Sequence, residues 1–599
     1  MIRQKNFIIL VAVCLVVLFL SASFVNLSVL QLVPAQATTL ISHGTNELDA
    51  VVETAAQQIK AQVLVGNTTQ NGFSLSTGKC TFYANGRNWV FWDNGTNWGY
   101  STSSNGTTWS SQTAIAASAA NTQGVDYAYC VVYNGTYVAY IREGSTLTGL
   151  YFGMGTPNSN GTITWLASEQ TVSSSSCLDP CMAFDTSGHV YICYSNNGYN
   201  FSISKNANSN GTWSTASGYP VSAYSESNQY YPYGSILQLS NGDMAVIFCI
   251  QKAPSQALYY SIYNGSTWGT EASFTTNIPK TWGAYAIIPF TAVSSGNTIY
   301  VTFVDSNYNL RFNTYSGGGW GTEVTLDSGL STVTFPSITV AGNDLYIFYD
   351  GNPTANTVYY LEFNGASWSS PHYWFNDNAE TLYPEETGVS GVYSMISSFQ
   401  NSGNGVIGLV YVTLSSPPYN VEFMSLDIAP PTYSKITTST SSAGQSCSFG
   451  ITWSDNVGLR SYIFGCNTTG TWVNKTAAAF TSNPQRISVS ATLSSATGDK
   501  DDYEWWANDT SNNFNSTGVQ SITVTSPPLH TPSPTPTPTP TPSPTPPPTP
   551  TPTPSQSSVK SPAQLLLITL VVSVIVILSV AIIAKKSTSS FSKISEKWS

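Results

Sequence analysis

A turn that ends in tryptophan recurs through the middle of the chain and restricts its fold more than any other feature. Each copy places Asn or Ser before Gly and ends in Trp, as in SSNGTTW and FNGASW, and β-rich runs separate successive copies. A period near 50 residues with several strands per period is typical of a β-propeller, so the sequence predicts an all-β fold. The final tryptophans are Trp109, Trp165, Trp213, Trp268, Trp320 and Trp368.

The repeat predicts seven blades within residues 66–429, at about 53 residues per blade. The last stretch, 396–428, has the strands without the Trp turn. Six blades would result if this stretch and an N-terminal strand near Phe73 together complete one blade. Within each turn Gly supplies a positive φ and Trp is expected to pack between neighbouring blades, so the motif is interpreted as scaffold.

Residues 430–526 show a different pattern of β-rich runs separated by turns. Their number and spacing predict an immunoglobulin-like β-sandwich after the propeller. Cys447 and Cys466 are expected to join two of its strands by a disulfide. The runs are SKITTST, SCSFGITWSD, LRSYIFGC, RISVSATLS, DYEWWANDTS and GVQSITVTS.

The start of the chain is typical of an exported protein. Arg3 and Lys5 precede an apolar run at 7–20, and Ala-Gln-Ala follows at 35–37. A basic region, an apolar core and a small-x-small site predict a secretory signal peptide. An uncleaved signal anchor is the alternative.

The end of the chain is typical of a membrane anchor on a stalk. Residues 565–584 contain no charge and are long enough to span a bilayer, and Lys585 and Lys586 place the following tail in the cytoplasm. Residues 530–555 are almost pure Thr-Pro and Ser-Pro, which adopts extended polyproline II. The expected order is a signal peptide at 1–37, a linker at 38–65, the propeller at 66–429, the sandwich at 430–526, a Pro/Thr-rich stalk at 527–561, a transmembrane helix at 562–584 and a cytoplasmic tail at 585–599.

The chain is unusually poor in charge, which bears on its partners. Charged residues are 9% of the chain and the net charge is −11, with no basic stripe for a nucleic acid backbone. Such a surface must present hydroxyl groups, amides or glycans to water. After the predicted signal peptide, twelve Asn-x-Ser/Thr sequons are candidate glycosylation sites: Asn67, Asn94, Asn105, Asn134, Asn160, Asn200, Asn210, Asn264, Asn467, Asn474, Asn508 and Asn515.

Eight cysteines follow Cys14 of the signal region, and all precede the stalk. An even number in an exported chain predicts disulfides, with Cys177 and Cys181 as a second candidate pair. Their spacing alone would also suit a zinc knuckle. The chain has four histidines and no second closely spaced Cys pair, so the disulfide interpretation is favoured over zinc.

The Trp turns resemble the Asp-box of sialidases and related BNR-repeat propellers, whose pattern is Ser-x-Asp-x-Gly-x-Thr-Trp. The best examples are WVFWDNGTNWGYSTSSNGTTW at 89–109 and the segment 131–165, similar to sialidase-like surface proteins of archaea and bacteria. The boxes are degenerate, with Asn105 where Asp is expected and Ser101 where an Arg usually precedes the first box. The sandwich strings SDNVGL and WWANDTSNN resemble Ig-like modules of archaeal surface proteins.

The sialidase resemblance implies three arginines that clamp a substrate carboxylate, a Tyr activated by a Glu, and an Asp acid/base. The propeller contains three arginines, so each would have to be a ligand. No GxSxG, P-loop or HExxH motif is present. The candidate catalytic residues are Arg87, Arg142, Arg311, Asp93 and Glu143.

These features predict a cell-surface protein that binds a glycan or a protein through the central face of the propeller. A sialidase-superfamily glycoside hydrolase is the first alternative and a structural envelope component the second, so enzymatic activity stays open. No cofactor is expected. Asp93, Asp305 and Asp455 lie in strings that would suit structural calcium, although plain β-turns explain them better.

Overall fold

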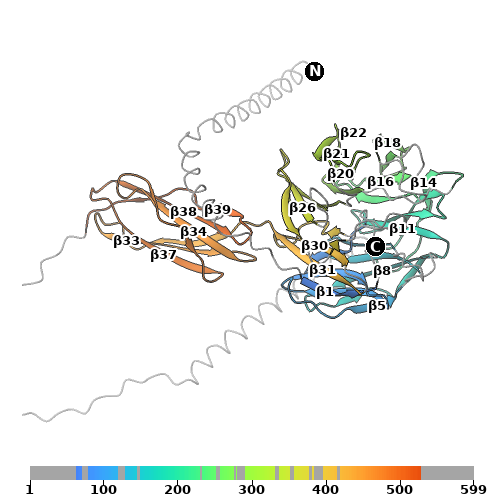
Figure 1. Cartoon of the computed structure of the whole chain (residues 1–599), viewed down its shortest axis with the longest axis horizontal. Helices are drawn as coiled ribbons and strands as arrows, with labels where there is room; N and C mark the ends of the chain where they lie inside the picture. The colour runs from blue at the N-terminus through green and yellow to red at the C-terminus, as the bar shows by residue number, and fades with distance from the viewer. Residues whose placement is uncertain are drawn as a thin grey trace, which may run out of the picture. The chain divides into compact units, whose positions relative to one another are not determined.

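The computed structural model describes residues 63–69, 78–118, 128–144, 149–228, 232–250, 257–275, 278, 290–330, 336–350, 357–376, 381–382, 396–414 and 418–527. These residues form strands and turns without a helix, which confirms the all-β prediction over this part of the chain (Figure 1). None of them forms a helix that is long and apolar enough to cross a membrane. The predicted signal peptide, transmembrane helix and tail lie outside the described residues.

Seven antiparallel sheets of four or five strands make up the larger part of the described chain. The first sheet contains β2 (Thr81–Ala84), β3 (Arg87–Asp93), β4 (Asn97–Ser103) and β5 (Thr113–Ala117), the second β6 (Tyr129–Tyr133), β7 (Val138–Glu143), β8 (Leu150–Pro157), β9 (Ile163–Trp165) and β10 (Gln170–Ser173), and the third β11 (Cys177–Phe184), β12 (Val190–Asn196), β13 (Asn200–Lys205) and β14 (Val221–Ser225). The fourth contains β15 (Tyr233–Gln238), β16 (Met244–Ile250), β17 (Ala257–Tyr263) and β18 (Ala272–Thr275), and the fifth β19 (Phe290–Ser295), β20 (Thr298–Val304), β21 (Leu310–Ser316), β22 (Gly319–Trp320) and β23 (Val324–Asp327). The sixth contains β24 (Ser337–Ala341), β25 (Asp344–Asp350), β26 (Thr357–Phe363) and β27 (His372–Asn376), and the seventh β28 (Thr381–Leu382), β29 (Ile396–Ser398), β30 (Val406–Leu414), β31 (Tyr419–Asp427) and the N-terminal strand β1 (Val63–Thr68).

The first strands of the seven sheets contact one another in order around a ring. Strands β2, β6, β11, β15, β19, β24 and β29 form the series, and β29 contacts β2 to close it. In the seventh sheet β29 shares the first position, beside β30, with the two-residue strand β28. In Figure 1 the colours accordingly pass from blue through green to yellow around the ring. Sheets arranged in this way around a common axis are a β-propeller.

The N-terminal strand β1 closes the ring from the other end of the sequence. It pairs antiparallel with β31, from Val63 opposite Phe423 to Thr68 opposite Tyr419. The strand begins inside the predicted linker 38–65, so the propeller starts slightly earlier than expected. It completes the sheet of the last stretch, as the six-blade alternative supposed, and the described sheets still number seven. Phe73 lies outside the described residues.

The turn tryptophans pack between neighbouring sheets, as predicted. Trp213 of the third sheet meets Phe152 of the second with ring centroids 5.3 Å apart, and Trp368 of the sixth meets Phe312 of the fifth at 4.8 Å. Trp109 of the first sheet meets Phe423 of the seventh at 4.9 Å. Edge-to-face pairs of this kind add to the apolar burial that holds adjacent sheets together.

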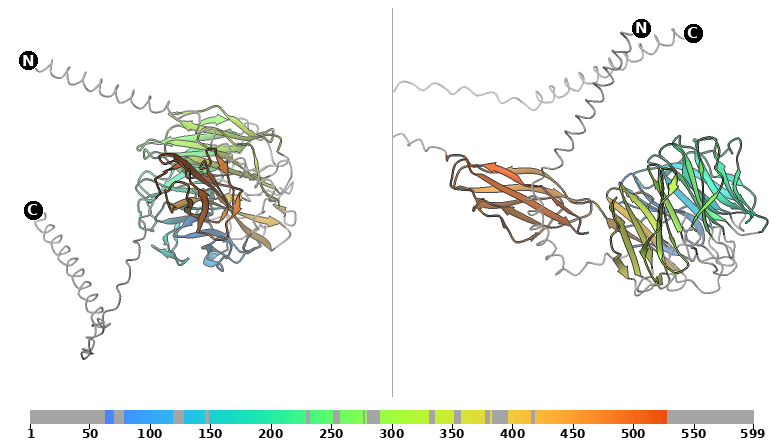
Figure 2. Two further views of the ribbon diagram at one scale, coloured as in Figure 1. Left: turned by 90° about the vertical axis from the view of Figure 1, so that its left-hand side faces the viewer. Right: turned by 90° about the horizontal axis from the view of Figure 1, so that it is seen from above.

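Two further sheets form a sandwich after the ring, drawn in orange in Figure 2. The side chains of Phe449, Trp453, Phe464 and Trp505 are buried in the core between them. The strands overlap the six runs predicted from the sequence. One sheet contains β32 (Thr432–Thr438), β33 (Ser446–Ser454) and β37 (Gln485–Thr492), and the other β34 (Leu459–Cys466), β35 (Val473–Asn474), β36 (Ala478–Ala479), β38 (Lys500–Asp509), β39 (Phe514–Ser516) and β40 (Gln520–Thr523).

The structure joins neither of the two predicted cysteine pairs. All eight cysteines of the described chain are buried free thiols. Cys447 donates to the carbonyl of Thr440, and Cys466 lies 3.7 Å from the Thr468 hydroxyl.

Cys177 and Cys181 lie on the same strand, β11, but the register of this strand shifts between them and their side chains contact different neighbours. Cys177 lies 3.3 Å from the hydroxyl of Ser173, whereas Cys181 lies 3.7 Å from Cys130 of the neighbouring sheet. The disulfide prediction is therefore corrected to a set of buried thiols.

Candidate functional site

A cavity of about 490 Å³ lies at the end of the ring where the first strand of each sheet turns into the second. Six of the seven sheets contribute to its wall. Its lining includes four amides (Asn134, Gln238, Gln400 and Asn401), four aromatic side chains (Phe82, Tyr83, Tyr133 and Phe184) and four hydroxyl side chains (Thr81, Ser240, Ser294 and Ser402). The lining contains no carboxylate, and Lys79 is its one charged residue.

The aromatic wall is fixed by packing and by backbone contacts. The rings of Tyr133 and Phe82 stack with centroids 5.2 Å apart, and the Tyr133 hydroxyl donates to the carbonyl of Gly135 at 2.7 Å. Tyr83 packs so tightly against Gly403 that a Cβ there would lie 2.2 Å from the Tyr83 Cβ. The two tyrosines are thus held in defined positions at the cavity, with half-buried side chains.

Lys79 lies buried between the first strands of three sheets. Its Nζ donates to the Ser337 hydroxyl at 2.9 Å, to the Ile338 carbonyl at 2.8 Å and to the Ser398 hydroxyl at 3.3 Å. Burial, which disfavours the ammonium form, lowers the pKa of Lys79 to about 7. The first, sixth and seventh sheets are therefore joined at the axis by an amine that is largely neutral above pH 7.

The structure does not bring the three predicted arginines together. Arg87 begins β3 and donates to the Ser159 carbonyl at 2.6 Å. Arg142, near the end of β7, forms an ion pair with Glu169. Within the described residues, no bonding partner of one arginine is shared with another, so the contacts there do not assemble the carboxylate clamp that the sialidase resemblance implies.

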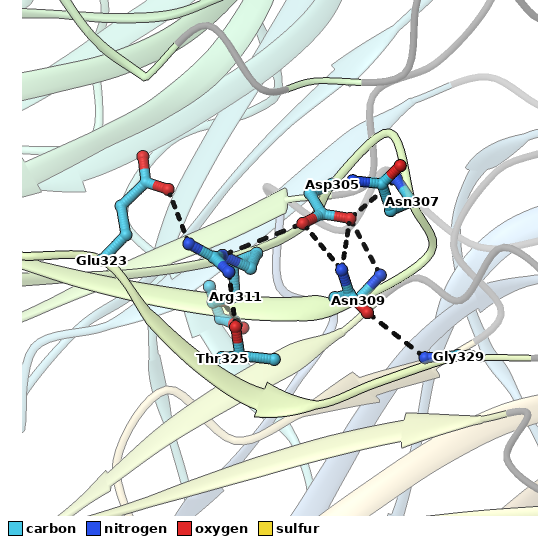
Figure 3. Close-up of polar contacts among 8 residues, drawn as sticks. Asp305, Asn307, Asn309, Arg311, Glu323, Thr325 and Gly329 are labelled. Atoms are coloured by element: carbon cyan, nitrogen blue, oxygen red, sulfur yellow. Dashed lines mark hydrogen bonds and ion pairs between the residues drawn. The ribbon is translucent and has the colours of Figure 1, made fainter.

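Arg311 belongs to a separate polar cluster in the fifth sheet (Figure 3). It bonds Glu323 at 3.1 Å and Thr325, and its Nε lies 3.9 Å from the buried Asp305. The Asp305 Oδ1 accepts the backbone N–H groups of Asn307 and Asn309 at 2.8 and 3.0 Å. The Asp305 carboxylate is thus occupied by its own turn, which supports the turn interpretation over calcium binding.

The remaining catalytic candidates also lie away from the cavity. Asp93 accepts the backbone N–H of Gly95 in a tight turn. Glu143 is 2% exposed and accepts the backbone N–H of Asp179 at 2.6 Å. Burial raises the pKa of Glu143 well above its usual range and that of Asp179 to about 7. Strand β7 runs from the cavity turn at 134–135 to Glu143, and β11 runs from near Asp179 to Phe184 at the cavity, so both carboxylates lie at the ends of their strands away from the cavity.

Three carboxylates from distant segments meet where the ring joins the sandwich. The ligand oxygens of Asp427, Asp455 and Asp509 lie within 4.8 Å of one another. Asp455 was a predicted turn residue, and its Oδ1 accepts the backbone N–H groups of Val457 and Gly458. Its two carboxylate neighbours were not predicted, because they lie 28 and 54 residues away in the sequence.

The sequons differ in exposure, which divides the glycosylation candidates. Asn508 is 3% exposed, and its Oδ1 accepts from both the backbone and the hydroxyl of Ser461. A glycan at Asn508 is incompatible with this packing, so Asn508 is removed from the candidate glycosylation sites. By contrast, Asn67, Asn105, Asn134, Asn160, Asn210 and Asn264 are exposed.

No protein-family model matches the chain, and no curated protein matches it either. Among solved structures, it is similar to an ulvan lyase of a polysaccharide lyase family, with 9% identity and a TM-score of 0.41 over 61% of this chain and 95% of the lyase. It is also similar to the lectin of Aleuria aurantia, a six-bladed β-propeller with a fucose recognition mode, with 13% identity and a TM-score of 0.32 over 50% of this chain and 94% of the lectin. At these scores the likeness carries no argument about function.

Proposed function

We propose that this protein is a seven-bladed propeller with an immunoglobulin-like module, anchored in the cell membrane, that binds glycans outside the cell through the central cavity. The seven sheets and the closed ring of first strands support the blade number. Export and anchoring rest on the sequence at 1–37 and 562–584.

The composition of the cavity wall carries the proposal of glycan binding. Amide and hydroxyl groups match the alternating donors and acceptors of a sugar ring, and aromatic side chains pack against its apolar face. A pocket of several hundred Å³ with a few oriented polar groups is the usual form of a small-ligand site. Protein partners generally dock on flatter surfaces, so the cavity favours a glycan as the occupant.

The same wall favours binding over hydrolysis. Glycoside hydrolysis by the usual route needs two carboxylates that flank the scissile bond. The cavity lining contains none, and Glu143 lies at the opposite end of β7. No observation in the described chain favours the sialidase alternative.

The test is a glycan array probed with the full chain in detergent, alongside two cavity variants. Tyr83→Ala and Gln238→Ala are expected to weaken binding about tenfold each, because each removes a contact of about 1 kcal/mol or more. Tyr373→Ala, which truncates an exposed aromatic outside the cavity, is the control. Absence of any bound glycan, or equal loss in all three variants, would reject the proposal. Release of reducing sugar from a bound glycan would instead favour the hydrolase.

A further inference from the structure

One of the sequons forms part of the cavity wall. Asn134 and Gly135 make the turn between β6 and β7 and both line the cavity. Asn134 is the one sequon asparagine among the lining residues. A modification of its side chain would therefore act at the proposed binding site.

The turn presents the Asn134 side chain in a fixed orientation. Its Oδ1 accepts the backbone N–H groups of Thr136 and Tyr137 at 3.0 and 2.8 Å, and Gly135 has a φ of 94°. Both contacts use the amide oxygen. The residue is exposed, and within the described part of the chain no acceptor is recorded for its Nδ2. The nitrogen to which an N-glycan is attached is therefore accessible in the folded protein.

A second turn repeats this geometry away from the cavity. In the loop between β17 and β18, the Asn264 Oδ1 accepts the backbone N–H groups of Ser266 and Thr267 at 3.1 and 3.0 Å. Tyr263 donates to the Gly265 carbonyl, as Tyr133 does to Gly135. Asn264 is exposed and does not line the cavity, so it is a matched control for Asn134.

We propose that an N-linked glycan on Asn134 lies over the cavity and competes with free glycans for it. The inference rests on the proposed function of the cavity. In the modification, Asn134 Nδ2 bonds to the anomeric carbon of a lipid-linked oligosaccharide, the lipid phosphate leaves, and the nitrogen loses one proton. A sugar tethered beside its own binding site has an effective concentration on the order of millimolar, which is enough to compete with weakly bound free glycan.

The experiment uses the full chain produced in a secretory host that attaches N-glycans, with sequon variants that preserve the asparagine turns. Thr136→Ala removes the sequon but leaves the Asn134 Oδ1 contacts, which are made to backbone groups. Ser266→Ala is the corresponding change at Asn264; it removes the bond from the Ser266 hydroxyl to Asn264 Oδ1 but leaves the two backbone contacts of that oxygen. For a tethered sugar that binds with a Kd of about 0.1 mM, a millimolar effective concentration weakens the binding of free glycan roughly tenfold. Thr136→Ala is therefore expected to tighten binding on the glycan array roughly tenfold, whereas Ser266→Ala leaves it unchanged.

A second readout needs no ligand and separates this inference from the proposed function. Ser240→Cys places an exposed thiol on the cavity wall, among native cysteines that are all buried in the described chain. Maleimide labelling of this thiol is expected to be slow in the glycosylated chain and several-fold faster with Thr136→Ala. Slow labelling without any array binding would retain the glycan's position and reject the proposed function. The inference is overturned if glycopeptide mass spectrometry finds Asn134 unmodified, or if both sequon variants label at the same rate as the parent.

Discussion

The buried amine of Lys79 makes a prediction about the pH dependence of stability that follows directly from its surroundings. Its pKa is lowered to about 7 in the folded chain because burial disfavours the charge. In the unfolded chain the amine stays protonated to about pH 10.4. The folded state therefore binds fewer protons than the unfolded state above pH 7. The penalty for burying the charge is fully present at low pH and is relieved as the pH rises from about 6 towards 10.

Between pH 6 and pH 8 the folded amine loses most of its proton, while the unfolded amine keeps it. The average difference of about half a proton over two pH units corresponds to about 1.4 kcal/mol of stability gained. Lys79→Met removes the titrating group and keeps the length of the side chain. Relative to the parent chain, the variant should therefore lose about 1.4 kcal/mol between pH 6 and pH 8.

The assay is urea unfolding monitored by tryptophan fluorescence at pH 6, 7 and 8, for the parent chain, Lys79→Met and the exposed control Lys475→Met. The variant also leaves the Ile338 carbonyl without its donor, which lowers stability equally at every pH. Only the change with pH is diagnostic. Parallel pH profiles for the parent chain and Lys79→Met would show that the amine is not desolvated as the structure describes, and the argument would fail.

Three further predictions concern the sandwich, the sheet contacts and the arginines. Burial, together with the charge of Asp427, raises the pKa of Asp509 to about 7, so the folded chain should lose stability as the pH rises from about 4 through 7. In Asp509→Asn the urea concentration at the midpoint of sandwich unfolding should change less with pH over this range. Trp213→Ala removes the contact with Phe152 and should lower the free energy of unfolding by about 2 kcal/mol or more in the same urea assay, against less than about 0.5 kcal/mol for Tyr373→Ala. Arg311→Ala breaks partly exposed contacts at residues that do not line the cavity, so it should leave glycan binding on the array unchanged. If Arg311 were part of a sialidase-type clamp, the same variant would lose binding of the substrate carboxylate.

The repeat made the fold predictable because its period comes from local chemistry. The Trp turns combine a glycine of positive φ with a tryptophan, and Trp213 and Trp368 pack against aromatic side chains of the adjacent sheet. The positions of the strands followed from the β-rich runs that lie between successive Trp turns. The strand pairing that closes the propeller was harder to predict from the sequence, because β1 and β31 are more than 350 residues apart.

The cavity residues were not predictable in the same way. No sequence motif surrounds Lys79, so nothing in the sequence marks it as a site residue. Its partners Ser337 and Ser398 could be identified only from the structure, in which the first strands of three sheets meet at the axis. The cysteine prediction failed for a related reason. Spacing places Cys177 near Cys181, but the register shift in β11 directs Cys181 towards the neighbouring sheet. The spacing of two cysteines along a strand reveals neither the register of that strand nor the sheet against which each side chain packs.

Strand direction also explains why a resemblance in the turns predicts scaffold better than activity. The first and second strands of six of the seven sheets meet at the cavity, so side chains of the connecting turns, such as Asn134 and Gln400, reach its wall. Glu143 and Asp179, two acidic groups of the ring whose pKa is raised by burial, come from the other end of such strands. Since the Trp turns connect strands further from the axis, they stabilise the ring whatever the axis contains. The Trp turns are therefore compatible with different side chains at the axis.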